Sequence, residues 1–125
     1  MPRLERRVLV VDDNRDSAHS LSTLLETLGC EVALAYDGEE ALAAGRRFRP
    51  DAVLLDLGMP RLNGFEACER MRAEWGAGIC IVAVTGWGDD EDRRRAQEVG
   101  FTAHLVKPVD PDKLAALLTT MSSRA

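Results

Sequence analysis

The 125-residue sequence lacks the features that mark several common classes of protein. It has only three cysteines, Cys30, Cys68 and Cys80, and no CxxC pair, so neither a disulfide framework nor a zinc site is expected. We interpret them as small apolar side chains. No apolar run approaches the roughly 20 residues of a membrane-spanning helix, and the charged start leads into too short an apolar stretch for a signal peptide. We therefore expect a cytoplasmic protein without a membrane segment.

The sequence also lacks a surplus of basic charge. Its 16 lysine and arginine residues stand against 21 aspartate and glutamate residues, which gives a formal net charge of -5. Binding to nucleic acid depends on clustered basic side chains, so we expect no direct contact with nucleic acid. Hydrophobic residues make up 46% and charged residues 30% of the chain, as in folded globular proteins. We expect a single domain over residues 1–125, with its core from about residue 6 to residue 121.

Five short apolar runs alternate with segments of helical spacing. The runs are Arg7–Val11, Glu31–Ala35, Ala52–Leu55, Ile79–Val84 and Ala103–Val106. The first, third and fourth are almost continuously apolar, which is typical of strands covered on both faces of a parallel sheet. The second and fifth are less uniform, as edge strands tend to be. The alternation predicts an α/β fold in which helices cover both faces of a parallel sheet.

Glycine and proline bound the five expected helices, which cover residues 18–28, 38–47, 63–75 and 89–99 and a segment that starts near residue 110. Gly29 and Gly100 follow the last apolar positions of the first and fourth helices. Pro111 suits the first position of the last helix, where its missing N–H costs no hydrogen bond. Arg93, Arg94 and Arg95 form a basic run in the fourth helix, which we interpret either as a solvated face or as a surface for a partner.

Polar side chains stand at the ends of four of these runs. They are Asp12 and Asp13, Asp56, Thr85 and Lys107. Ligands of open parallel sheets bind at the carboxyl ends of the strands, so we expect these side chains to lie together. Three neighbouring carboxylates repel one another unless a cation is bound, and Mg²⁺ prefers carboxylate, water and phosphate oxygens. A hydroxyl and an ammonium group suit phosphate oxygens, so the set predicts magnesium-assisted phosphoryl transfer.

The positions of the three carboxylates in the sequence predict different roles for them. Asp56 stands alone after a central run and before a turn with Gly58 and Pro60, which makes it the candidate nucleophile for an acyl phosphate. Asp12 and Asp13 are better suited as metal ligands. Both can reach one ion only if the chain leaves the strand there, because neighbouring strand residues point to opposite faces. Alternatively, they cap the helix that follows.

Four motifs stand in register with the expected strands: Asp12-Asp13, the loop Asp56-Leu-Gly-Met-Pro with Asn63-Gly64 beyond it, Val84-Thr85-Gly86, and Val106-Lys107-Pro108. Together they resemble the response-regulator receiver family, from about residue 6 to residue 121. The resemblance implies a flavodoxin-like fold with strand order 2-1-3-4-5. It also implies that Asp56 accepts a phosphoryl group from the phosphohistidine of a histidine kinase or a histidine phosphotransfer protein.

The same resemblance implies a magnesium site. Its ligands would be Asp13, Asp56 and the main-chain carbonyl of Gly58, while Asp12 would contribute through water. The domain would assist its own phosphorylation and hydrolysis and would not turn over an outside substrate.

The resemblance further implies roles for residues of the last two strands. Thr85 and Lys107 would bind the phosphoryl oxygens, and the Lys107–Pro108 peptide would be cis. His104 stands at the position of the family's switch aromatic, which turns inward when Thr85 moves toward the phosphoryl group. A histidine departs there from the commoner tyrosine or phenylalanine, so His104 is either this switch or a plain half-buried strand residue. Trp87 stands two residues after Thr85, at a position that influences the attack of water on the acyl phosphate in this family. Our own hypothesis is that Trp87 shields the acyl phosphate from water, and the alternative is a loop aromatic without kinetic effect.

Partners follow from the resemblance as well. The donor is expected to dock on the first helix near Asn14, Arg15 and Ser17. An output domain or protein would bind the face formed by the fourth helix, the fifth strand and the fifth helix. The parent chain is either a stand-alone regulator or a hybrid histidine kinase. Two rival functions are a pseudo-receiver that signals by binding alone and a metal-dependent phosphohydrolase, although no Asp-x-Asp pair of nucleophile and acid directly follows a strand here.

Overall fold

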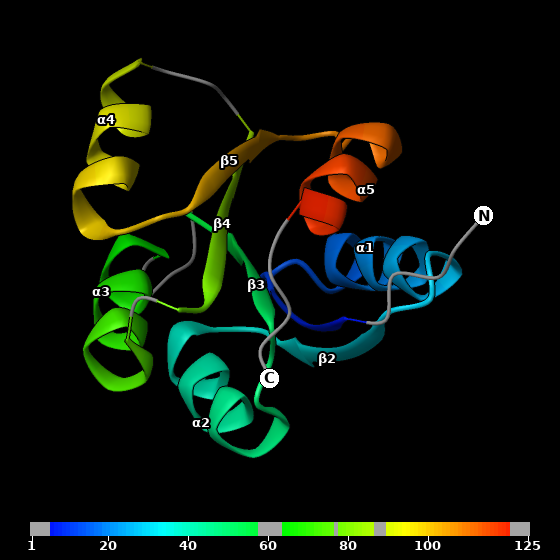
Figure 1. Ribbon diagram of the computed structural model, residues 1–125, viewed down its shortest axis with the longest axis horizontal. Helices are drawn as coiled ribbons and strands as arrows, with labels where there is room; N and C mark the ends of the chain where they lie inside the picture. Colours follow the sequence, from blue (N-terminus) through cyan, green and yellow to red (C-terminus); the bar gives the residue numbers. More distant parts are fainter. Residues whose placement is uncertain (1–5, 58–63, 77, 87–89, 121–125) are drawn as a thin grey trace.

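The computed structural model of the chain describes residues 6–57, 64–76, 78–86 and 90–120. In this part of the chain, strands and helices alternate five times, as the sequence pattern predicts (Figure 1). The elements are β1 (Arg7–Val11), α1 (Arg15–Thr27), β2 (Glu31–Ala35), α2 (Gly38–Phe48), β3 (Ala52–Asp56), α3 (Gly64–Trp75), β4 (Cys80–Thr85), α4 (Asp90–Val99), β5 (Ala103–Val106) and α5 (Pro111–Thr120). No helix among the described residues is both long and apolar enough to cross a membrane.

The five strands form one parallel sheet in the order β2-β1-β3-β4-β5, which confirms the predicted fold. The inner strands β3 and β4 are buried almost throughout, and β1 is buried after its first residue. The edge strands β2 and β5 are mostly half-buried. The less uniform apolar runs therefore belong to the edges of the sheet, as expected, because each edge strand has a neighbour on one side only.

Each face of the sheet carries its own core, because successive strand side chains alternate between the two faces. Leu9 and Val11 of β1 pack with α2, α3 and α4, whereas Val8 and Val10 pack with α1 and α5. Figure 1 shows the same division, with α1 and α5 on one side of the sheet and the other helices opposite.

The three cysteines are buried and form no disulfide, as the sequence predicts. Burial raises the pKa of the Cys68 thiol to about 11, so this side chain is neutral at physiological pH. Cys30 and Cys80 belong to the core on the α1 and α5 side, and Cys68 belongs to the opposite core. All three fill the cores as small side chains, and the Cys68 thiol also donates to the Val99 carbonyl at 3.6 Å.

The residues that cap the helices agree with local side-chain chemistry, but the cap of α1 differs from the predicted one. Asn14, not Asp12 or Asp13, caps α1, because its side chain accepts a hydrogen bond of 3.0 Å from the backbone N–H of Ser17. The alternative that the two aspartates cap this helix is therefore wrong. Gly100 ends α4 with a φ of 105°, a conformation that glycine adopts without steric cost.

Candidate functional site

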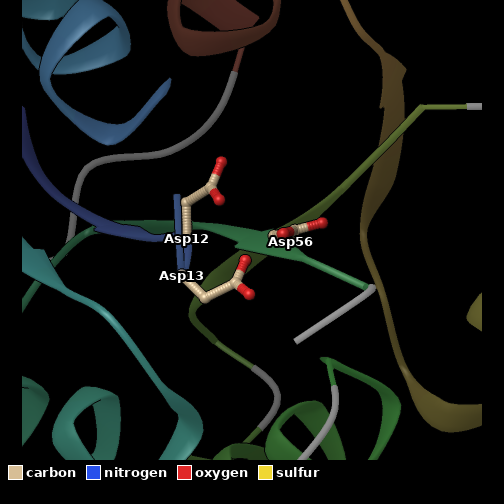
Figure 2. Close-up of side chains that lie close together, drawn as sticks. All are labelled: Asp12, Asp13 and Asp56. Atoms are coloured by element: carbon tan, nitrogen blue, oxygen red, sulfur yellow. The ribbon is translucent and has the colours of Figure 1, made fainter. Parts of the chain in front are cut away.

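Three carboxylates converge at the carboxyl ends of β1 and β3. Asp12 and Asp13 follow β1, and Asp56 is the last residue of β3. The two strands are paired, with Val11 opposite Leu55, so their ends lie side by side. One oxygen from each carboxylate lies within 4.8 Å of the others. Figure 2 shows all three side chains at this edge of the sheet.

The three carboxylates differ in their surroundings. Asp12 is buried, with 4% of its surface exposed, whereas Asp13 is exposed and Asp56 is half-buried. Since β1 ends at Val11, the chain has already left the strand at Asp12, and both neighbouring aspartates reach the cluster. Asp12 is held at both oxygens, since Oδ1 accepts the Asn14 N–H at 2.9 Å and Oδ2 accepts the ammonium of Lys107 at 2.9 Å.

Lys107 is the cation of this site. Its Nζ pairs with Asp12, and its backbone N–H donates to the carbonyl of Thr85 at 2.7 Å. Burial alone would lower the pKa of this ammonium. The hydrogen bond with Asp12 and the charges of Asp56, Asp12 and Asp13 together outweigh burial, so the pKa is raised above its usual value. The group is therefore fully charged at neutral pH. The Lys107–Pro108 peptide is cis, as the family resemblance implies.

Thr85 is the last residue of β4, and only 4% of its surface is exposed. The register of the sheet places Asp56 opposite Val84, so Thr85 lies one residue beyond the level of Asp56. On its other side Thr85 is paired with Val106, the residue before Lys107. The sheet thus brings Thr85 to the edge that carries the carboxylates and the lysine.

His104 lies on β5 away from the carboxylate cluster. It is half-buried and stands opposite Ala83 of β4, a member of the core on the α4 side of the sheet. Together with Ala96 and Gln97 of α4, it lines a cavity of about 280 Å³. His104 of β5 therefore lies beside α4 across this cavity. Its role as a switch stays a prediction.

A larger hollow of about 670 Å³ opens beside the carboxylates, between α1 and the segment that follows β5. Asp12 and Lys107 line it, and Leu21 and Leu24 of α1 supply part of its apolar wall. Of the three residues at which donor docking is expected, Asn14 and Ser17 line this hollow. Arg15 lies instead over the ring of Tyr36, with its Cζ 4.1 Å from the ring centroid.

One contact at this end of the molecule could not be predicted from the sequence, and two of the expected site residues lie outside the described residues. The contact of Arg15 with Tyr36 has no sequence signal, because it joins a helix to the end of a different strand. Gly58 and Trp87 are not among the described residues. The Gly58 carbonyl as a metal ligand and the shielding by Trp87 therefore stay predictions.

The chain has a doubly wound α/β fold with the strand order of flavodoxin-like proteins. Its acidic cluster lies at the carboxyl ends of the strands, where such folds bind their ligands. The chain belongs to the response-regulator receiver domain family, whose model matches residues 8–119.

Relatives and solved structures agree with this assignment. The chain is 39% identical over 116 residues to the DNA-binding response regulator MtrA of Mycobacterium bovis, which covers 93% of this chain and 50% of MtrA. It superimposes on the chemotaxis protein CheY4 of Vibrio cholerae with a TM-score of 0.88 at 33% identity, covering 94% of this chain and 99% of CheY4.

A further neighbour is the receiver domain of the sensor histidine kinase PA1611 from Pseudomonas aeruginosa, solved with a magnesium ion coordinated in its active-site cleft. The TM-score is 0.85 at 31% identity, and the match covers 94% of this chain and 97% of that one. The chain spans about half the length of the curated relatives that it matches.

Proposed function

We propose that this chain is a phosphoacceptor receiver of a two-component phosphorelay, in which Asp56 takes a phosphoryl group from a phosphohistidine. The donor is a histidine kinase or a histidine phosphotransfer protein. The observation that carries the proposal is the cluster of Asp12, Asp13 and Asp56 within 4.8 Å, joined at Asp12 to the ammonium of Lys107. Such a set combines a nucleophile, metal ligands and a cation for the phosphoryl oxygens.

The carboxylates fit a magnesium ion. Three carboxylate oxygens within 4.8 Å offer the hard ligands that this ion prefers. Both oxygens of Asp12 already accept hydrogen bonds, so Asp12 is suited to contact through water. Asp13 and Asp56 are the proposed direct ligands. The Gly58 carbonyl would complete the protein ligands. When bound, the ion neutralises charge on the phosphoryl oxygens. The magnesium named for the PA1611 receiver supports this proposal by analogy.

The side chains of the chain supply the remaining parts of the transfer. A carboxylate oxygen of Asp56 forms a bond to phosphorus while the bond from phosphorus to the donor imidazole nitrogen breaks. The imidazole leaves with the electron pair of that bond. Lys107 pairs with the phosphoryl oxygens, and the Thr85 hydroxyl donates a hydrogen bond to one of them. The domain positions these groups for its own phosphorylation and hydrolysis.

Phosphorylation then changes the surface that partners contact. A carboxylate becomes a dianionic group, which draws Thr85 toward it and lets His104 turn inward. This shifts an equilibrium that exists before phosphorylation and alters the face of α4, β5 and α5. MtrA is named a DNA-binding regulator and is about twice as long as the match. With a net charge of -5, this segment is proposed to contact the donor and an output domain or protein and not DNA.

Intact-mass spectrometry after incubation with acetyl phosphate and Mg²⁺ tests the proposal, with Asp56→Asn as the control. We expect one added phosphoryl group on the wild type alone and none when a chelator is present. No adduct on the wild type under short, quenched incubations would instead favour a pseudo-receiver that signals by binding. Many turnovers of a small phosphoester would favour a phosphohydrolase.

A further inference from the structure

The side chains of helix α4 that the structure describes, those of residues 94–99, make little apolar contact with the rest of the molecule. Among residues 94–99, only Ala96 is fully buried and Val99 is half-buried, while the other side chains are exposed. The cavity of about 280 Å³ lined by His104 lies between this helix and β5. Helices with so few buried contacts open locally at low free-energy cost, so the polar contacts that hold them become decisive.

Two arginines join α4 and the segment after it to α3. Arg72 of α3 fixes the chain after α4, because its guanidinium donates to the Gly100 carbonyl at 2.8 Å and to the Thr102 hydroxyl at 3.0 Å. Arg95 holds the helix itself. Its Cζ lies 4.1 Å from the centroid of the Phe65 ring, on the first turn of α3. A guanidinium over an aromatic face is attracted by the ring's negative π-surface.

Gly64, the residue before Phe65, lies against the backbone of the candidate phosphoacceptor. A Cβ atom at Gly64 would lie 2.5 Å from the backbone oxygen of Asp56 and 2.7 Å from the Cα of Leu57. The first turn of α3 therefore rests directly on the backbone of the strand end that carries Asp56. A contiguous set of contacts leads from Asp56 through Gly64 and Phe65 to Arg95 on α4.

We infer that the contact between Arg95 and Phe65 is a latch that holds α4 against α3 in the unphosphorylated protein and thereby opposes phosphorylation of Asp56. The second half of this inference rests on the proposed function. A movement of the Asp56 strand end or of α4 that separates the guanidinium from the ring has to give up this attraction. Coupling between two sites is reciprocal, so weakening the latch frees α4 and also favours the phosphorylated form. Arg95 acts here as a positioning residue.

Amide hydrogen exchange on the unphosphorylated protein tests the latch itself. In Arg95→Gln, we expect exchange across residues 94–99 to be about two- to fivefold faster than in the wild type, which is the loss expected for an exposed cation–π contact. Arg94→Gln removes the same charge from the neighbouring, exposed position and should exchange like the wild type. Arg95→Lys keeps a cation for the ring and should restore much of the protection. Equal exchange in Arg95→Gln and Arg94→Gln would overturn the inference.

A double-mutant cycle separates the latch from a general loss of helix stability. Phe65→Leu keeps an apolar side chain at this buried position but removes the π-face. In that background, Arg95→Gln should accelerate exchange no further, because the partner of the cation is already gone. A full additional effect of Arg95→Gln in the Phe65→Leu protein would show that Arg95 acts through another contact and would refute the latch.

The coupling to Asp56 is measured with beryllium fluoride and Mg²⁺, a stable mimic of the phosphoryl group, by isothermal titration calorimetry. Arg95→Gln should bind the mimic about two- to fivefold more tightly than the wild type, and Arg94→Gln should not. Faster exchange with unchanged affinity would refute the coupling. If the wild type binds no mimic at all, the proposed function and the coupling both fail, while the exchange experiment still decides whether the latch holds α4.

Discussion

Replacement of Gly64 by alanine should displace the candidate phosphoacceptor through its own backbone. The added Cβ would lie 2.5 Å from the Asp56 carbonyl oxygen and 2.7 Å from the Leu57 Cα. Ordinary contacts of a Cβ begin at 3.4 Å, so the two backbones have to separate by about 0.9 Å. Neither neighbour is the flexible end of a side chain. The end of β3 and the first turn of α3 must therefore move apart.

The magnitude follows from two opposing effects. Overpacking a well-packed site costs about 1–3 kcal/mol. Alanine regains up to about 1 kcal/mol over glycine within a helix, although less at the first helical residue. We therefore expect Gly64→Ala to lower the free energy of unfolding by about 1–2 kcal/mol. For a domain of this size, each kcal/mol corresponds to a drop of roughly 3–5 °C in Tm.

The assay pairs urea unfolding with the rate of phosphorylation by acetyl phosphate, and Gly78→Ala is the matched control. A Cβ at Gly78 would meet no atom within 4 Å, so this variant should be as stable as the wild type or slightly more stable, because alanine restricts the unfolded chain. Gly64→Ala should also be phosphorylated more slowly, since Asp56 is displaced. If Gly64→Ala matches Gly78→Ala in both stability and phosphorylation rate, the reasoning is refuted.

Three further predictions concern charged groups. Lys107→Met should lower the free energy of unfolding at neutral pH by about 1 kcal/mol, because the buried Asp12 loses its cation while the lysine is one-third exposed. Urea unfolding of the wild type should show this contribution in full at neutral pH and lose it as the pH rises from the ordinary lysine pKa through the raised pKa of Lys107. Asp13→Asn should raise Tm in a chelator, because it relieves like-charge repulsion, and should abolish the rise in Tm that Mg²⁺ gives the wild type. The hydrogen bond from Arg46 holds the pKa of Glu74 below its usual range. Any stability from this exposed pair is therefore present at neutral pH and lost as the pH falls through the lowered pKa of Glu74. Urea unfolding of Arg46→Met at different pH values should not show this loss.

The sequence predicted the fold because its signals are local. Continuous apolar runs distinguished the inner strands from the edges, and the observed bounds differ little, with β4 beginning at Cys80 and not at Ile79. The same topology placed Asp12 and Lys107 at one edge of the sheet, although they lie far apart in the chain. Their direct contact is a hydrogen bond that only the folded packing fixes.

The contacts of α3 and α4 could not be predicted in this way. A run of arginines in a helix looks the same whether its side chains are solvated or one of them lies over an aromatic ring. The partner of Arg95 is on another helix, and its position depends on how the two helices pack on the sheet. Similarly, nothing local shows that Arg72 reaches the carbonyl of Gly100 beyond the end of α4. The partner of a long, flexible cationic side chain depends on tertiary packing, which the periodicity of the sequence does not specify.

The charges of the site argue that cation binding and phosphorylation depend on each other. Within the cluster, three carboxylates lie close enough to repel one another, and the ammonium of Lys107 pairs with Asp12. Such repulsion costs stability in the free protein, which is common where function and folding make different demands. A phosphoryl group on Asp56 would add to the negative charge unless a divalent cation were bound. The same three carboxylates that destabilise the free site therefore create the affinity for the ion that the proposed phosphorylation requires.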